Sequence, residues 1–426
     1  MKALTLLLLT LALTTTLAHA ASYSRNSTPT SGLWNDSATW TPSGYPQLQG
    51  DEADFTLTAS VTTQVDDDGR FTTTSVIRAT LSTGGAAILS RQTAAANSDN
   101  LVLLSNVSGY AHVVLSGSTT ATSPLNLNDT LRVECVHPIV VSNAYNNSGR
   151  PIVLSCDFFG SGDIICQGVG PIRFGFNAGG CEESVYTGTI YVRAMSANGK
   201  ATFYSSVRAF TNSPNAKIVV QNTGVLGVEQ ANSRCNLPIT LQQGSLLTCN
   251  SANTANYVTV IGATTFDSSV AAGVLTVEGT LSGTGTISRS GNASGAMQFV
   301  GTIAPGFSAG TLVLNENVGT LRLGLAGDTV LLSIEDGDVI SNMNMGAAID
   351  LANIDVVFTT TTTLGTTNWF LHADNGFANS FNSTSYGSFT GYLVTEANRI
   401  GAVVVPEPVA VCGVALLVVL RRRLAA

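Results

Sequence analysis

Between about residues 52 and 350 the chain alternates short apolar runs with turn residues. Runs of four to eight β-branched or apolar residues are separated by Gly, Asn, Asp and Ser. Such runs predict β-strands with turns between them. Examples are 75–81, 101–107, 112–117, 131–141, 151–156, 217–222, 273–279 and 310–317. No stretch of a dozen residues shows the 3.6-residue apolar period with helix caps, so we expect little helix.

The spacing of these runs, about 20 residues, is typical of a stacked solenoid. In a solenoid each coil buries its apolar face against its neighbours. We therefore predict an all-β, parallel β-solenoid over residues 52–346. An array of β-sandwiches would use similar strands and turns and is the alternative.

Residues 273–314 carry the most regular pattern. They read GVLTVEGTLSGTGTISRSGNASGAMQFVGTIAPGFSAGTLVL, with Gly279, Gly285 and Gly301 each before Thr-Leu or Thr-Ile. We expect alternate strand residues to enter the core and Gly or Pro-Gly to form sharp corners. This stretch resembles the autotransporter-associated β-strand repeat, which implies a right-handed β-helix. Residues 164–193 resemble a degenerate copy, whereas residues 52–160 match poorly.

Two flanking segments are expected to cap the solenoid, whose terminal rungs would otherwise expose apolar side chains and strand edges. In residues 21–51, Gly32, Trp34 and Trp40 followed by two prolines resemble the "G-x-W…W-x-P" opening segment of secreted surface proteins. We expect both tryptophans to cover the end of the solenoid, and stacking on sugars is the alternative. Residues 347–404 are predicted to form a closing β cap.

The first 20 residues have the features of a secretory signal peptide. Lys2 precedes an apolar run, and the small-residue pattern Ala18-His19-Ala20 stands before Ala21. This pattern predicts export by the secretion translocase and cleavage by signal peptidase after Ala20. A retained membrane anchor is the alternative, but the apolar run is shorter than the ~20 residues that span a bilayer.

Residues 405–426 have three parts. Pro406, Glu407 and Pro408 precede twelve apolar residues, after which come Arg421, Arg422 and Arg423. A twelve-residue helix would reach only about 18 Å, less than the ~30 Å hydrocarbon core, so it is a poor permanent anchor. The segment resembles the PEP-CTERM sorting signal, and a chance apolar tail is the alternative.

That resemblance implies a partner and a location. The tail would enter the membrane as a short transmembrane helix, with the arginines on the cytoplasmic side. An exosortase-type membrane transpeptidase would then recognise Pro-Glu-Pro and remove the tail, which leaves the protein at the cell surface or in the extracellular matrix.

Composition restricts the function classes. Only 11% of residues are charged, and outside residues 1–20 and 421–426 the chain carries 15 basic against 27 acidic side chains. This acidic balance would repel nucleic acid, so we expect no nucleic-acid partner. The mean hydropathy is +0.27, so the chain has enough apolar side chains to fold, which argues against disorder.

The sequence contains no complete catalytic or metal-binding motif. His112, His137 and His372 have no metal-ligand spacing, and no G-x-S-x-G motif joins a strand to a helix. The acidic clusters Asp66-Asp67-Asp68 and Glu335-Asp336-Gly337-Asp338 lie among Gly in predicted turns. We expect solvated acidic turns, no cofactor and no enzyme. Calcium binding, or acid and base roles in a polysaccharide lyase or hydrolase, are the alternatives.

Six cysteines remain once Cys412 of the sorting tail is set aside. In an exported chain they permit three disulfides. Cys135 and Cys156 are one coil apart by spacing, and Cys235 and Cys249 would close a shorter loop. Buried free thiols are the alternative.

These observations favour an exported cell-surface or extracellular-matrix β-solenoid of a diderm bacterium. The family resemblance implies a structural or adhesive role in contact with exopolysaccharide. A β-helical polysaccharide-degrading enzyme and a carbohydrate-binding surface protein using Trp34 and Trp40 are the alternatives.

Overall fold

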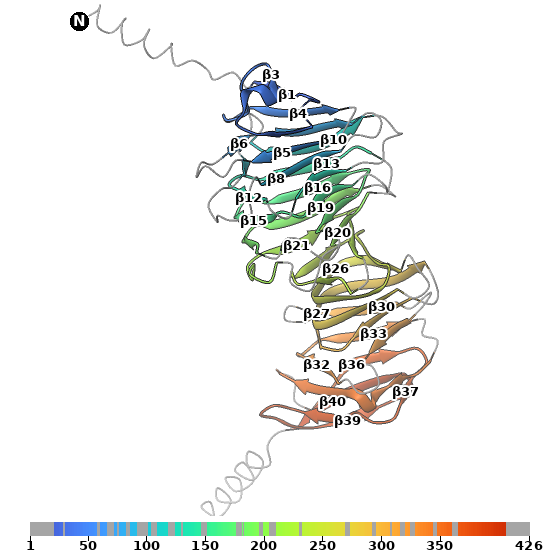
Figure 1. The fold of residues 1–426 in the computed structure, drawn as a ribbon. Coiled ribbons are helices and arrows are strands. Elements are labelled where there is room, and N and C mark those ends of the chain that lie inside the picture. The colour runs from blue at the N-terminus through green and yellow to red at the C-terminus, as the bar shows by residue number, and fades with distance from the viewer. Residues whose placement is uncertain are drawn as a thin grey trace, which may run out of the picture. The chain divides into compact units, whose positions relative to one another are not determined.

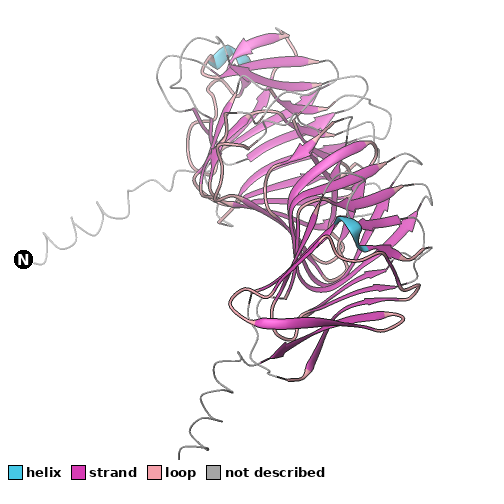
Figure 2. Ribbon diagram, turned by 90° about the horizontal axis from the view of Figure 1, so that it is seen from below, coloured by secondary structure: helices cyan, strands magenta, loops and turns pink. Residues whose placement is uncertain are grey.

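The computed structural model describes residues 21–405, apart from short internal segments, and most of these residues lie in β-strands joined by loops and turns (Figure 2). The segments not described are 29, 58–59, 66–71, 75, 82–85, 92–100, 104–108, 118–123, 129–130, 146–150, 176–180, 182, 196–198, 204–209, 230–231, 269–272, 292–294, 307–308, 316–319, 324–328, 344–346 and 360–364. Among the described residues the only helices are two 3-10 turns, η1 (Ser37–Thr39) and η2 (Leu351–Asn353).

The chain divides into two compact units. Unit 1 contains the residues up to 191 together with 195–201 and 210–216, and unit 2 contains 192–194, 202–209 and the residues from 217 onward. Strands β19 (Thr189–Met195) and β20 (Ala201–Phe203) hold residues of both units.

Unit 1 is a solenoid with three faces, and each face is a sheet of parallel strands (Figure 1). As the chain winds round, successive turns add strands to each sheet in sequence order. The first sheet contains β1 (Ser22–Arg25), β4 (Glu52–Leu57), β7 (Val76–Leu81), β10 (Ala111–Gly117), β13 (Ile139–Asn143) and β16 (Ile164–Gly168). The second contains β2 (Ser31–Leu33), β5 (Val61–Val65), β8 (Ala87–Arg91), β11 (Leu125–Leu127), β14 (Ile152–Leu154) and β17 (Ile172–Phe174). The third contains β6 (Thr72–Thr74), β9 (Leu101–Leu103), β12 (Arg132–Cys135), β15 (Asp157–Gly160) and β18 (Val185–Tyr186).

The apolar alternation of each strand explains this arrangement. Successive side chains of a strand point to opposite faces, so every second residue enters the interior. In-register pairing then stacks the inward residues of successive coils. One such stack in the first sheet consists of Ala53, Ile77, Val113, Val141 and Cys166, each at most 2% exposed.

Unit 2 repeats the plan. Its first sheet contains β21 (Lys217–Val220), β24 (Ile239–Gln242), β29 (Thr302–Pro305), β32 (Val330–Ile334), β35 (Ile354–Phe358) and β38 (Ser383–Ser385). The second contains β22 (Val225–Val228), β25 (Leu246–Cys249), β30 (Thr311–Asn315), β33 (Val339–Met343) and β36 (Thr367–Ala373), and the third β23 (Arg234–Cys235), β28 (Ala296–Phe299) and β31 (Thr320–Leu323). Strands β26 (Ala252–Ser268) and β27 (Val274–Gly291) run through all three sheets. A separate short pair joins β34 (Ile349–Asp350) to β37 (Phe377–Ala378).

Glycines form corners of unit 2 because neighbouring coils approach too closely for a side chain. A Cβ at Gly301 would lie 1.9 Å from the carbonyl oxygen of Gly279, and one at Gly283 would lie 2.1 Å from that of Val260. Gly283 also has a φ of 105°, which disfavours other residues. The glycines of the 273–314 pattern therefore lie where the backbones of successive coils approach each other closely.

Both ends of the described chain depart from parallel stacking. In unit 1, β3 (Trp40–Thr41) pairs antiparallel with β1. In unit 2, β39 (Thr390–Thr395) and β40 (Arg399–Val405) form an antiparallel hairpin, and β40 also pairs antiparallel with β36.

The predicted all-β parallel solenoid is confirmed, and the sandwich alternative fails because strands distant in sequence pair in parallel. The right-handed sense stays a prediction. The predicted sorting helix lies outside the described residues, and no helix among those described is long and apolar enough to cross a membrane.

The Gly301 corner can be tested by Gly301→Ala. The added methyl group must displace backbone of the preceding coil, so we expect a loss of about 1–3 kcal/mol in the free energy of unfolding, measured by urea denaturation. Gly109→Ala is the contrast: its φ is 81° but no atom lies within 4 Å of the new Cβ, so only the backbone cost of about 1 kcal/mol is expected. Wild-type stability of Gly301→Ala would contradict the close approach.

Candidate functional site

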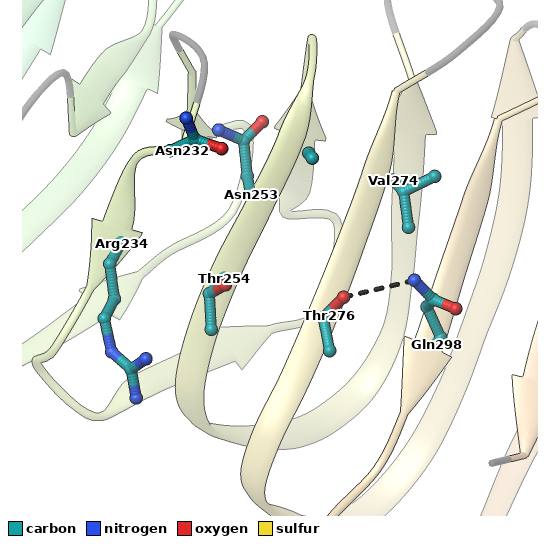
Figure 3. Close-up of a pocket in the computed structure, with 8 residues that line it drawn as sticks. Asn232, Arg234, Asn253, Thr254, Val274, Thr276 and Gln298 are labelled. Atoms are coloured by element: carbon teal, nitrogen blue, oxygen red, sulfur yellow. Dashed lines mark hydrogen bonds between the residues drawn. The ribbon is translucent and has the colours of Figure 1, made fainter. Parts of the chain in front are cut away.

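A shallow hollow of about 390 Å³ lies over the third sheet of unit 2 (Figure 3). It is lined by Asn232, Arg234, Ala252, Asn253, Thr254, Val274, Thr276 and Gln298. These residues come from β23, from the first parts of β26 and β27, from β28 and from the turn before β23. The hollow therefore runs across successive coils, and we call it the polar groove.

A column of polar side chains forms the middle of the polar groove. Arg234 pairs with Thr254, Thr254 with Thr276, and Thr276 with Gln298. Because adjacent strands are about 4.8 Å apart, the column offers one polar side chain at each such step. Gln298 Nε2 donates a hydrogen bond to Thr276 Oγ1 at 3.2 Å, which Figure 3 shows as a dashed line. The column is thus a direct product of strand register.

Arg234 is held at one end of this column by three side chains. Its Nε donates to Asn236 Oδ1 at 3.1 Å, its Nη2 donates to Asn256 Oδ1 at 2.5 Å, and its Nη1 lies 2.8 Å from Glu278 Oε2. The Arg234 and Glu278 side chains are 28% and 41% exposed, so this ion pair contributes at most about 1 kcal/mol. Its main effect is to orient the guanidinium group and to offset its charge.

An exposed aromatic residue follows one of the residues that hold this arginine. Tyr257 is 47% exposed and follows Asn256, which binds Arg234. Its Cε1 atom lies 2.9 Å from the position of a Cβ at Gly279, so the ring occupies the space that this glycine leaves open. A flat ring beside amide and hydroxyl groups offers apolar contact and hydrogen bonds together.

The acidic cluster at residues 335–338 contributes no residue to the lining of this groove. Asp66, Asp67 and Asp68 lie outside the described residues. In the second cluster Asp338 is only 1% exposed, so the expectation of a solvated acidic turn is wrong for this residue. Its Oδ2 accepts the amide of Glu335 at 2.9 Å and its Oδ1 accepts that of Gly310 at 3.0 Å. Asp338 therefore fixes its own turn and ties it to the preceding coil, and its burial raises its pKa.

The histidines lie on separate elements. They are His112 in β10, His137 between β12 and β13, and His372 in β36. Burial and the charge of Arg78 lower the pKa of His112, although Glu52, whose Oε1 lies 2.5 Å from Arg78 Nε, opposes them. Within the part of the chain that the structure describes, no three His, Cys, Asp or Glu residues are grouped closely enough to hold a metal ion.

The two predicted disulfides, Cys135–Cys156 and Cys235–Cys249, are absent. All six cysteines between residues 135 and 249 are buried and none is in a disulfide. Arg132 pairs with Asp157, so this coil is 25 residues long rather than 21, and Cys135 stands opposite Gly160. Cys235 and Cys249 lie in different sheets.

The thiols are instead part of the core. Cys181 Sγ donates to the carbonyl oxygens of Leu154 and Cys156, at 3.4 and 3.3 Å. Burial raises the pKa of the Cys156 and Cys181 thiols well above the ordinary value. Both therefore stay protonated at neutral pH and are poor nucleophiles.

The tryptophan pair does not offer a sugar-binding platform. Trp34 and Trp40 are 0% and 2% exposed, and their rings meet edge to face at 5.1 Å. Trp34 Nε1 donates to the Pro46 carbonyl at 2.9 Å, and Trp40 Nε1 donates to the Trp34 carbonyl at 2.7 Å. Since no ring face is open to solvent, the hypothesis that these tryptophans stack on sugars is wrong.

Most of the predicted sorting and cleavage residues lie outside the residues that the structure describes. Ala18, Ala20, Pro406, Glu407, Pro408, Arg421, Arg422 and Arg423 are not described, whereas Ala21 is. The polar groove is not predictable from the sequence, because nothing in the residue order shows that Arg234, Thr254, Thr276 and Gln298 share a register position.

Unit 1 also contains a buried carboxylate that the sequence motifs did not indicate. Asp157, at the start of β15, is 8% exposed and accepts the amide of Glu183 at 2.9 Å. Burial raises its pKa to about 6, although the Glu183 hydrogen bond opposes the shift. The available signal was its place within the apolar run 151–159, where an acidic residue is unusual.

We expect Asp157→Asn to stabilise the protein only at higher pH. The raised pKa means that the protonated carboxyl suits the fold, so stability present below about pH 4 is lost as pH rises through about 6. Asparagine keeps an acceptor for Glu183 and carries no charge. Urea denaturation should show a gain of about 1–3 kcal/mol at pH 8 and little change at pH 4. The exposed Asp374→Asn is the control, and an equal effect at both pH values would contradict this assignment.

No protein-family model matches the chain, and no curated protein or solved structure is detectably similar to it. Its function is therefore inferred from the fold, the polar groove and the sequence motifs.

Proposed function

We propose that this protein is an exported, non-enzymatic β-solenoid with a structural or adhesive role at a bacterial cell surface or in its extracellular matrix. The parallel β-solenoid fold is the observation that carries the proposal. Outward-facing strand positions such as Thr62, Gln64 and Thr240 carry hydroxyl and amide groups, which suit weak contacts with a hydrated polymer.

The lining of the polar groove supports a binding role rather than a catalytic one. Its residues are amides, hydroxyls, small apolar groups and one arginine. Glycoside hydrolysis requires two carboxyl groups facing a common substrate, and neither Asp nor Glu is among the lining residues. A polysaccharide lyase or hydrolase remains the alternative, and it would need a site elsewhere.

A second candidate function is carbohydrate binding at the polar groove. Specific support comes from the exposed Tyr257, which follows the Asn256 that binds Arg234, and from the column of Thr254, Thr276 and Gln298. An extended polysaccharide running across the coils would meet a hydrogen-bonding group at each coil and an apolar surface at the tyrosine. Exopolysaccharide is therefore the proposed partner.

Export and sorting complete the proposal. The Ala18-His19-Ala20 pattern supports cleavage before Ala21, and Pro406-Glu407-Pro408 with the three terminal arginines supports recognition by an exosortase-type transpeptidase. The last described strand, β40, ends at Val405, directly before this motif. The protein would be membrane-associated during sorting and at the surface or in the matrix afterwards.

The sorting proposal predicts loss of the tail in the native host. Mass spectrometry of the surface form should find a C-terminus near Pro406-Glu407-Pro408 and no peptide that contains Cys412. Glu407→Ala should leave unprocessed protein in the membrane, because Glu407 is the only charged residue of the motif. Glu396→Ala, which changes an exposed glutamate of the folded part, should be processed normally. Intact Leu424-Ala425-Ala426 on the mature protein would contradict sorting.

The binding proposal predicts that Tyr257→Ala and Gln298→Ala weaken retention on exopolysaccharide of the native host by about tenfold each in affinity electrophoresis. Tyr392→Ala is the matched control, because Tyr392 is also exposed, at 54%, but lies on β39 away from the groove residues. The purified protein should release no reducing sugars or unsaturated products. Equal weakening by the control, or turnover of the polymer, would contradict the assigned role.

A further inference from the structure

A buried carboxylate receives the backbone nitrogen of Ala21, the residue after the predicted signal-peptide cleavage site. Asp51 is 1% exposed. Its Oδ1 accepts the nitrogen of Ala21 at 3.1 Å, while its Oδ2 accepts the amides of Gln47 and Leu48 at 3.0 and 2.9 Å. One oxygen therefore stabilises the turn before β4, and the other is directed at the start of the predicted mature chain.

The surrounding coils fix this arrangement. The Glu52 amide donates to the Ala21 carbonyl at 2.8 Å, which joins the start of β1 to β4. The Asp51 carbonyl in turn accepts the Val76 amide and the Thr74 hydroxyl of the next coil, both at 3.1 Å. Because backbone bonds hold both residues, the carboxylate and the Ala21 nitrogen cannot readily separate.

The burial of this carboxylate is the unusual feature. A buried ionised carboxylate is costly unless a cation or several hydrogen bonds compensate it. The donors to Asp51 from Ala21, Gln47 and Leu48 are backbone nitrogens, which carry no formal charge while Ala20 is still attached. Removal of the preceding residue would make one of them a cation.

We propose that cleavage after Ala20 creates an α-ammonium group at Ala21 that forms a partly buried ion pair with Asp51. The inference rests on the export proposed above. Signal peptidase hydrolyses the Ala20–Ala21 amide: water supplies the hydroxyl of the new Ala20 carboxyl group, and the freed Ala21 amine is protonated at neutral pH. The nitrogen thereby changes from a single neutral donor to a positive group with three hydrogens.

This change would strengthen the contact between β1 and β4 once the signal peptide has been removed. A charge-assisted hydrogen bond is roughly twice as strong as a neutral one. The uncut precursor would hold β1 more weakly on β4, which is compatible with passage through a translocase in an unfolded state. Cleavage would then stabilise the end of the solenoid where β1 lies.

The test compares four chains in a double-mutant cycle. Two begin at Ala21, after removal of the initiator methionine, and two carry a Gly-Ser extension that keeps an amide at Ala21. Each pair contains the unchanged chain and Asp51→Asn, and all run to Ala426 in a mild non-ionic detergent. Urea unfolding is followed by tryptophan fluorescence, to which the buried Trp34 and Trp40 contribute.

We expect the extension to raise the unfolding equilibrium constant about tenfold in the Asp51 background and to have no effect in Asp51→Asn. Asp54→Asn, which changes a half-buried carboxylate of β4 in register with Ser24, should keep the tenfold difference. Equal stability of the two Asp51 chains, or a difference that persists in Asp51→Asn, would overturn the ion pair.

Two further measurements distinguish failure of the ion pair from failure of the proposed cleavage site. If Asp51→Asn fails to fold, the chain beginning at Ala21 is compared with its Nα-acetylated form, which removes only the charge, and equal stability overturns the proposal. N-terminal sequencing of the exported protein tests the cleavage site independently. A start other than Ala21 would refute processing at this bond even where the cycle shows that the ion pair can form.

Discussion

In-register parallel stacking is the constraint on which the rest of each unit depends. Each coil lies about 4.8 Å from the next, so a residue at one position of a coil contacts the residue at the same position of its neighbours. Apolar residues must therefore recur at equivalent positions. The stack of Ile218, Ile239, Val258, Leu281, Ile303, Leu332 and Val356 in unit 2 has no member more than 1% exposed.

The same constraint decides which polar residues are tolerated inside. Asn143 is fully buried in line with Leu115, where its Nδ2 donates to the Pro171 carbonyl and its Oδ1 accepts the Tyr145 amide. Gly168, the partner of Asn143 in the next coil, has a φ of 118°, and a Cβ there would lie 2.3 Å from the Asn143 carbonyl oxygen. Asn143 thus satisfies backbone groups at a corner, where unpaired groups would be costly.

The sequence was sufficient to predict the fold class but not the contacts between coils. The alternating runs and the Gly-Thr-Leu pattern around Gly279 and Gly301 indicated strands and close corners, because both follow from local chemistry. Coil length is not local: paired residues are 19 apart between Ile239 and Val258 but 36 apart between Val76 and His112. An average spacing therefore misplaced the cysteine pairs and did not show the groove column. The residues around Trp34 and Trp40 predict a cap at one end of the solenoid, whereas the enclosure of both rings depends on tertiary contacts that the residue order does not show.

The ends of a solenoid need chemistry that its interior does not. An interior coil is held on two sides, whereas a terminal coil has one neighbour and a free row of backbone donors and acceptors. At the end containing β1, the Trp34–Trp40 pair and the antiparallel β3 supply extra contacts. At the end containing β40, the hairpin turns the chain antiparallel, and the Arg399 guanidinium lies 4.0 Å from the centre of the Trp369 ring. A coil that is held on one side gains most from any additional bond. The junction of Ala21 and Asp51 is therefore a place where a single change of charge on processing would have a large effect on stability.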